Sequence, residues 1–211
     1  HAIALLLSIT RNLNYIAKNK ISIMPRPIEL RGKNALILGM GGIGSLIAEK
    51  LSCFGVNITA VDQKLIPMNS FINEFYYQQD IEKIISKADI VICAVPSTKS
   101  SNKIFSNNLF EKMKNGVIFI NISRGKIVDT DALLSYLKKD KFLGVGLDVT
   151  DPEPLDMSHA LQNDVRVIIT PHIAGLSEYN RNRALEVLHT NLKNYILNNP
   201  LINIVNKKLG H

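Results

Sequence analysis

Residues 34–44 read Asn-Ala-Leu-Ile-Leu-Gly-Met-Gly-Gly-Ile-Gly, and this segment carries the strongest structural signal in the chain. The apolar run Ala35–Leu38 predicts a buried strand, and Gly39, Gly41 and Gly44 follow it with the spacing GxGxxG. In this pattern the first glycine permits a tight turn, the second lets a pyrophosphate approach the backbone, and the third lets helix and strand pack closely. The helix that follows offers its N–H groups and positive dipole end to phosphates, so the segment predicts a dinucleotide site.

An acidic residue strengthens this interpretation. A second apolar run, Val56–Val61, ends at Asp62, eighteen residues beyond Gly44. A carboxylate there can accept hydrogen bonds from both hydroxyls of an adenosine ribose and repels a 2′-phosphate. NAD is therefore favoured over NADP, with Lys64 the one nearby feature that favours a phosphate. The simpler alternative is an ordinary helix start followed by a surface aspartate.

Outward from this segment, short runs rich in β-branched residues alternate with helical stretches. Further strands are expected at Ile90–Val95, Val117–Ile120, Leu143–Val149 and Val167–Ile169. Helices are expected at Ile43–Phe54, Ile81–Lys87, Asn107–Lys114 and Asp131–Lys139, the last with Asp131 close to the expected N-cap position. Near-continuous apolar strands alternating with helices are typical of a doubly wound parallel α/β sheet covered on both faces, a Rossmann-like fold.

Three regions are expected along the chain. Residues 1–24 form an amphipathic helix with apolar side chains at steps of three and four, and Pro25 and Pro27 follow it as a linker. Residues 25–176 form the nucleotide-binding domain. Residues 177–211 hold a last helix, about Glu178–Asn198, whose apolar face is Ala184, Leu185, Leu188, Leu192 and Tyr195.

Composition narrows the partners and the compartment. The 211 residues carry a net charge of +7, but the charges are scattered with no run of five like charges, so a nucleic-acid partner is not expected. The apolar run Ala2–Ile9 is too short to span a bilayer and lacks the features of a signal peptide. Cys53 and Cys93 show no disulfide or zinc spacing and are expected to be buried free thiols. We therefore expect a cytoplasmic protein without a membrane or metal partner.

Polar residues follow the predicted strands where ligands bind in open α/β sheets, outside the carboxyl ends. Arg124 could hold a carboxylate with two parallel hydrogen bonds, and His172 could pass a proton near neutral pH. Glu153, held between Pro152 and Pro154, could stabilise a protonated His172. Taken singly, Arg124 is as readily a surface arginine. For His172 and Glu153 taken singly, a core or loop histidine and a solvated turn acid are the favoured interpretations. The remaining histidines, His1 among them, lack metal-ligand spacing and are interpreted as surface residues.

The motifs together resemble the NAD-dependent D-isomer-specific 2-hydroxyacid dehydrogenases, the family of glycerate, phosphoglycerate and D-lactate dehydrogenases. The segment 1–7 is similar to the interdomain helix of that family, and 121–129 (Asn-Ile-Ser-Arg-Gly-Lys-Ile-Val-Asp) is similar to its arginine motif. Gly-Leu-Asp-Val at 146–149, followed by Glu153-Pro154, resembles the acid motif, and Thr-Pro-His-Ile-Ala-Gly at 170–175 resembles the histidine motif.

The resemblance implies a role for each site residue. Arg124 binds the substrate carboxylate, His172 is the acid/base on the 2-oxygen, Glu153 pairs with His172, and Asp148 holds the nicotinamide amide. The cofactor site as a whole is expected to comprise Gly39, Gly41, Gly42, Ile43, Gly44, Asp62, Val95, Pro96, Ser101, Ile122, Ser123, Arg124, Asp148, His172 and Gly175.

The chain also departs from the family pattern. Gly42 stands where members often carry a basic residue, and Pro96-Ser97-Thr98 stands for Pro-Leu-Thr. Most of the substrate domain would precede His1, so the sequence is expected to be a fragment of something longer. Residues 1–24 are then a remnant of that domain, and the helix and tail of residues 177–211 are expected to pack toward it. The expected function is hydride transfer between NAD(H) and a small 2-hydroxy or 2-oxo acid, by a homodimer. The alternatives are a NAD-sensing, corepressor-like module, a truncated non-catalytic remnant, and a dehydrogenase of another Rossmann class.

Overall fold

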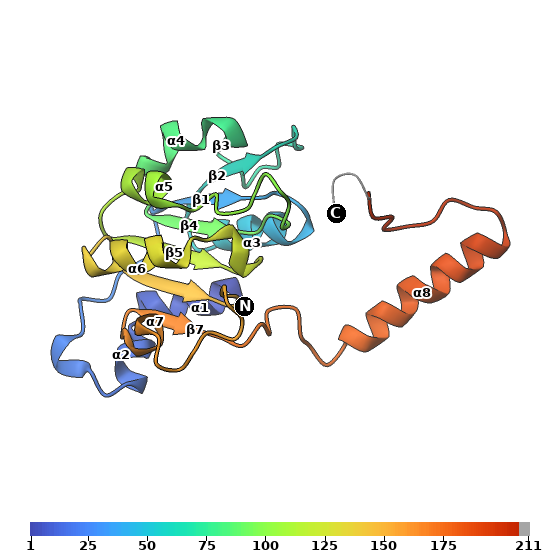
Figure 1. The fold of residues 1–211 in the computed structure, drawn as a ribbon. Coiled ribbons are helices and arrows are strands. Elements are labelled where there is room, and N and C mark those ends of the chain that lie inside the picture. The colour runs from blue at the N-terminus through green and yellow to red at the C-terminus, as the bar shows by residue number, and fades with distance from the viewer. Residues whose placement is uncertain (207–211) are drawn as a thin grey trace. The chain divides into compact units, whose positions relative to one another are not determined.

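The computed structural model describes residues 1–206, and the chain divides into a unit of residues 1–172 and a unit that begins at Ile173. The first unit holds one sheet of seven strands in the order β3-β2-β1-β4-β5-β6-β7, with every neighbouring pair parallel (Figure 1). The strands are β1 (Asn34–Leu38), β2 (Asn57–Asp62), β3 (Glu74–Tyr77), β4 (Ile90–Cys93), β5 (Val117–Asn121), β6 (Phe142–Leu147) and β7 (Val167–Ile169). This order confirms the predicted doubly wound α/β fold.

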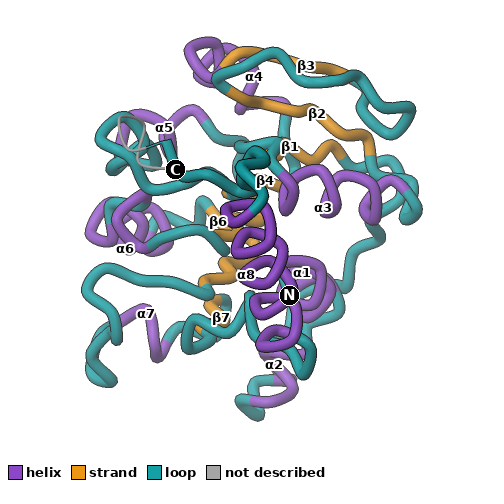
Figure 2. Tube along the Cα trace, turned by 90° about the vertical axis from the view of Figure 1, so that its right-hand side faces the viewer, coloured by secondary structure: helices purple, strands orange, loops and turns teal. Residues whose placement is uncertain are grey.

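Helices cover both faces of the sheet. The α-helices of the first unit are α1 (Ala2–Thr10), α2 (Leu13–Ala17), α3 (Gly42–Ser52), α4 (Ile81–Ile84), α5 (Asn107–Lys112), α6 (Thr130–Lys138) and α7 (Ala160–Asn163). Short 3-10 turns are η1 (Ile21–Ile23), η2 (Gln78–Asp80), η3 (Ile85–Lys87) and η4 (Gly125–Ile127). Figure 2 shows the sheet edge-on, with α1 and α3 on one side and α4, α5 and α6 on the other.

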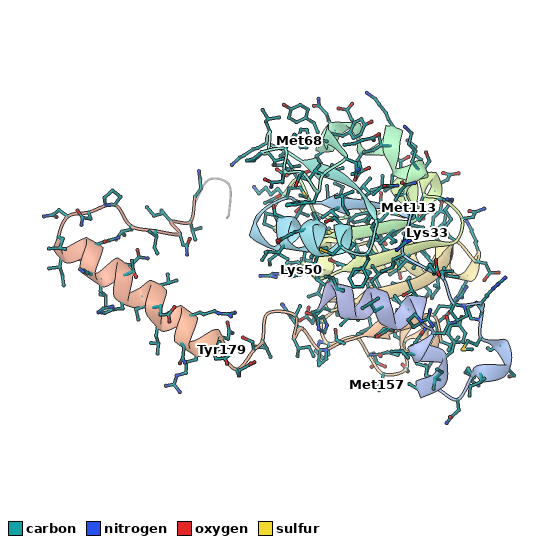
Figure 3. The ribbon with its side chains drawn as sticks, turned by 180° about the vertical axis from the view of Figure 1, so that it is seen from behind. Lys33, Lys50, Met68, Met113, Met157 and Tyr179 are labelled. Atoms are coloured by element: carbon teal, nitrogen blue, oxygen red, sulfur yellow. The ribbon has the colours of Figure 1, made fainter. Side chains whose placement is uncertain are left out.

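The two faces divide the core between them because side chains alternate along a strand. On β1, Leu36 and Leu38 belong to the cluster under α5 and α6, whereas Ala35 and Ile37 belong to the cluster under α1 and α3. Four phenylalanines pack with one another in the first cluster: Phe105, Phe110, Phe119 and Phe142. Met113 is buried in this cluster, in contrast to the exposed Met157 of a surface loop (Figure 3).

The first helix lies directly against the sheet. A Cβ placed on Gly144 would come within 2.3 Å of Ile9 Cγ2, so α1 can approach β6 closely only over glycine. The expectation of a single continuous amphipathic helix at the N-terminus was wrong. Asn12 adopts the left-handed conformation, with φ at 58°, and divides the segment into α1 and α2. Its side-chain amide donates to the carbonyl of Pro25 at 2.7 Å, which compensates for the break.

Other expectations need correction. Strand β3 was missed because Glu74–Tyr77 is a half-exposed edge strand rather than an apolar run. Asp129, not Asp131, caps α6, since its carboxylate accepts from the N–H of Ala132 at 3.1 Å. Cys53 is exposed at the end of α3, whereas Cys93 is buried as expected. The predicted thiol burial therefore fails for Cys53, which lies past the last buried turn of its helix.

The second unit contains α8 (Asn180–Ile196). None of its residues is buried, and its expected apolar face, including Leu185, Leu188 and Leu192, is exposed. The packing of this region toward a substrate domain stays a prediction, and positions 207–211 of the expected tail lie outside the described residues. Within residues 1–206, no helix has both the length and the apolar character needed to cross a membrane.

Candidate active site

The glycine segment forms the predicted turn between β1 and α3. A Cβ on Gly44 would lie 1.8 Å from the carbonyl oxygen of Gly39, so only glycine allows the helix to pack on the turn. By contrast, a Cβ on Gly41 or Gly42 would meet nothing within 4 Å. The N-cap of α3 is Gly41, which has no side chain to accept hydrogen bonds from the helix. The first N–H groups of a helix have no partners within the helix, so those of α3 are available to a ligand. Open space in front of unpaired donors, with the exposed Ile43 beside it, fits a diphosphate group.

Asp62 lies at the end of β2, next to this turn. Its Oδ2 accepts from the N–H of Met40 at 2.7 Å, and its Oδ1 accepts from the N–H of Lys64 at 3.0 Å. The carboxylate therefore connects the glycine turn to the exit of β2 while remaining half-buried. This position fits the predicted contact with the ribose hydroxyls of an adenosine.

The loop after β4 approaches the same turn. A Cβ on Gly39 would come within 2.8 Å of Val95 Cγ1, so the two loops are in direct contact. Pro96 is exposed, but Ser101 is buried, and its hydroxyl donates to the carbonyl of Pro96 at 2.8 Å. Ser101 therefore holds the loop together from inside, and its predicted place in the cofactor groove stays a prediction.

Arg124 follows β5 on a loop organised by Asn121. The Asn121 side chain is fully buried, and its Oδ1 accepts from the N–H of Ser123 at 3.0 Å and from the Ser123 hydroxyl at 2.7 Å. Its amide donates to the carbonyl of Arg124 at 3.1 Å. Arg124 is exposed, and its Nη1 donates to the carbonyl of Ser123 at 2.6 Å. Ile122, which lies between Asn121 and Ser123 in the chain, is half-buried. The hydrogen bonds of Asn121 therefore hold the backbone from which the Arg124 side chain extends.

The loop after β6 lies against the arginine loop. A Cβ on Gly125 would be 1.9 Å from the carbonyl oxygen of Thr150, a contact that no other residue allows. The Thr130 hydroxyl donates to the carbonyl of Asp151 at 2.7 Å, which holds the segment leading to Glu153. Glu153 Oε1 is 2.6 Å from Nδ1 of His172. The predicted pairing of Glu153 and His172 is thus present in the structure.

His172 occupies a constrained turn after β7. Its φ is 55°, a left-handed conformation that costs energy for a residue with a side chain. Its N–H donates to the carbonyls of Asp148 and Thr170, both at 2.9 Å, and these bonds hold the turn. The Asp148 side chain has no exposed surface, and its Oδ1 accepts from the Thr170 hydroxyl at 2.6 Å. A contact between Asp148 and a nicotinamide amide stays a prediction.

One residue at this site was missed. His1 was interpreted as a surface histidine, and the residue as a whole is exposed. Its side chain, however, is only 20% exposed, and its Nε2 lies 2.9 Å from the Thr170 hydroxyl and 3.3 Å from Asp148 Oδ1. The N-terminus lies beside the exit of β7 in both views (Figures 1 and 2). No local pattern marks His1, because its partners are 147 and 169 residues away along the chain.

The buried thiol of Cys93 is not a nucleophile for this site. Burial raises its pKa to about 11, although hydrogen bonds, including one with the Ser123 hydroxyl, act in the opposite direction. A neutral thiol is a weak nucleophile, so Cys93 is a packing residue beneath the arginine loop. Among residues 1–206, no cluster of three or more His, Cys, Asp or Glu could hold a metal ion. Gly175 belongs to the second unit.

Sequence comparison identifies relatives of this chain. The family described as "D-isomer specific 2-hydroxyacid dehydrogenase, NAD binding domain" matches residues 3–174. A glyoxylate reductase of Thermofilum pendens is 35% identical over 171 residues, which are 78% of this chain and 48% of the relative. A D-3-phosphoglycerate dehydrogenase of Archaeoglobus fulgidus is 30% identical over 217 residues, which are 98% of this chain and 40% of the relative.

Solved structures agree with these relatives. The crystal structure of phosphoglycerate dehydrogenase from Lactobacillus plantarum matches 97% of this chain and 67% of that protein, with a TM-score of 0.78 and 30% identity. The chain spans about half the length of the curated relatives that it matches. Both the strand order and the matched residues lead to one assignment. The chain belongs to the D-isomer specific 2-hydroxyacid dehydrogenase family and carries its NAD-binding domain.

Proposed function

We propose that this chain is part of an oxidoreductase that transfers hydride between NAD(H) and a small 2-hydroxy or 2-oxo acid of the D-series. The observation that carries the proposal is the 2.6 Å hydrogen bond between His172 Nδ1 and Glu153 Oε1, on a loop adjoining that of Arg124. A histidine oriented by a carboxylate serves proton transfer, and an exposed guanidinium on the adjoining loop serves to bind a carboxylate.

The proton step follows from the ring orientation. Because Nδ1 is bonded to Glu153, Nε2 is the nitrogen that can face a substrate. In the reducing direction, the protonated His172 gives its Nε2 proton to the 2-oxygen as negative charge develops there, and Glu153 stabilises the imidazolium. The cofactor, when bound, supplies the hydride chemistry.

Arg124 holds the acid in place. Its guanidinium can form two parallel hydrogen bonds with the substrate carboxylate, which orients the 2-carbon relative to His172. Asn121 and Ser123 fix the backbone that presents the guanidinium. The glycine turn, with the open space at Gly41 and Gly42, would hold the diphosphate of the dinucleotide, and Asp62 its adenosine ribose.

The experiment is an NADH oxidation assay with a panel of 2-oxo acids that includes glyoxylate, hydroxypyruvate and pyruvate. We expect His172→Ala to lower kcat at least about a hundredfold. Glu153→Gln should also lower kcat for reduction, because the amide no longer stabilises the protonated His172. Near wild-type turnover in His172→Ala would refute the acid/base role. Binding of NADH without turnover of any acid by the full-length protein that contains this chain would favour a NAD-sensing module.

We also propose that the protein acts in the cytoplasm as a homodimer. Both cysteines are free thiols, which suits a reducing compartment. Light scattering coupled to size-exclusion chromatography tests the assembly, and a mass of 23.5 kDa, that of one chain, would contradict the dimer.

A further inference from the structure

We infer that His1 is a positioning residue for His172, and that it acts through a hydrogen-bonded group of three side chains, His1, Asp148 and Thr170, here named the histidine clasp. This inference rests on the proposed function, because it assigns His1 a part in presenting the acid/base residue. Neither the matched family description nor the names of the relatives assign a role to this position.

The direction of each hydrogen bond in the clasp follows from the available protons. A carboxylate only accepts, so the Thr170 hydroxyl gives its single proton to Asp148 Oδ1 at 2.6 Å. The Thr170 oxygen, 2.9 Å from His1 Nε2, must then accept. Nε2 of His1 therefore carries a proton, and Asp148 Oδ1 lies 3.3 Å from this nitrogen.

The clasp is directly connected to the turn of His172. Asp148 and Thr170, which supply its two acceptor side chains, also supply the two backbone carbonyls that hold the N–H of His172. His172 needs these bonds because its φ of 55° lies in the left-handed region. A side chain that fixes Asp148 and Thr170 relative to each other thus stabilises the backbone conformation that directs the His172 ring.

The His1 ring does not act as a cap for its own helix, α1. His1 occupies the N-cap position of α1 but makes no side-chain capping hydrogen bond. Serine, threonine, aspartate or asparagine would cap α1 better. The imidazole instead reaches the Thr170 hydroxyl, so its replacement removes no cap from α1.

Two substitutions of His1 separate the hydrogen bond from simple packing. Leucine fills space but donates nothing. Glutamine places its Nε2 donor the same number of bonds from the backbone as the imidazole Nε2 of histidine. His189→Leu, on the exposed surface of α8, is the matched control for loss of an imidazole.

The first measurement needs neither cofactor nor substrate. Amide hydrogen exchange of His172 should accelerate about fivefold in His1→Leu, the effect of losing one hydrogen bond to a neutral hydroxyl, and should stay near wild type in His1→Gln and His189→Leu. The N–H of Phe105, bonded to the carbonyl of Ile127 at 3.1 Å, is the internal reference. Equal acceleration at Phe105 would indicate general loss of stability and overturn the inference, as would unchanged exchange in His1→Leu.

The second measurement is turnover. In His1→Leu, kcat for 2-oxo acid reduction should fall about fivefold with the KM for NADH changed less than about twofold, and His1→Gln should restore kcat. A glutamine variant as impaired as the leucine variant would overturn the inference. If the full-length protein that contains this chain turns over no 2-oxo acid, the proposed function fails, while the exchange measurement still decides whether the clasp holds His172.

Discussion

Replacement of Asn121 by alanine tests whether buried hydrogen bonds hold the arginine loop. The Asn121 side chain is fully buried at the end of β5 and makes three hydrogen bonds, of 2.7, 3.0 and 3.1 Å, to Ser123 and Arg124. A buried hydrogen bond contributes about 0.5–1.5 kcal/mol to stability, so three contribute about 3 kcal/mol. The alanine variant also leaves the N–H of Ser123 and the carbonyl of Arg124 without these partners.

Urea denaturation followed by circular dichroism measures the loss. With a slope of about 2–3 kcal/mol per molar for a protein of this size, Asn121→Ala should lower the midpoint by about 1 M without changing the slope. The matched control is Ser123→Ala, which removes one of the three bonds together with the Cys93 contact and should cost about 1 kcal/mol.

The loss of stability at this loop should be accompanied by weaker binding of the 2-oxo acid. Because Asn121 holds the Arg124 backbone, the KM for the 2-oxo acid should rise in Asn121→Ala more than the KM for NADH. A change in unfolding free energy below about 0.5 kcal/mol, or a loss equal to that of Ser123→Ala, would refute the reasoning. Either result would mean that the Asn121 hydrogen bonds do not hold the loop.

Three further predictions concern the cofactor turn and the thiols. In urea denaturation, Gly44→Ala should lower the unfolding free energy by more than about 2 kcal/mol, because its Cβ would lie 1.8 Å from a carbonyl oxygen. Gly41→Ala should change that free energy by less than about 0.5 kcal/mol and should weaken NADH binding. Equal stability losses in the two variants would contradict this prediction. Asp62→Asn should raise the Kd for NADH about tenfold or more in fluorescence titrations, because a charged acceptor of Met40 N–H and of the ribose is lost, and unchanged affinity would exclude the ribose contact. Iodoacetamide at pH 8 should modify one thiol per native chain, Cys53, because burial raises the Cys93 pKa to about 11 and leaves almost no thiolate there, whereas two modified thiols would show that Cys93 is accessible.

Much of the fold was predictable because its signals are local. Apolar runs such as Ala35–Leu38 and the glycine spacing that ends at Gly44 depend on residues within one turn or one strand of each other. The failures have local causes too. The edge strand Glu74–Tyr77 has no apolar run to mark it, and the left-handed Asn12 interrupts a helical pattern that periodicity alone treats as continuous.

The candidate site was predicted in part. Asp62, Arg124 and His172 follow strands, and parallel strands bring their carboxyl ends to one edge, so the sheet topology already implied that such residues would gather there. The pairing of Glu153 with His172 was predicted from chemistry and resemblance, and the structure shows it at 2.6 Å. The supporting role of Asn121 was missed, because a buried asparagine at a strand end looks like any polar loop residue.

The amino-acid order alone was enough to indicate a parallel α/β sheet, a glycine turn for a dinucleotide, and an arginine, an acid and a histidine beyond its strands. Short-range periodicity and residue chemistry carry that information. Only the folded chain could bring His1 to Thr170, 169 residues away, or bury Asp148 between them. Such contacts depend on how α1 packs against β5 and β6, and packing between distant segments leaves no spacing pattern in the sequence.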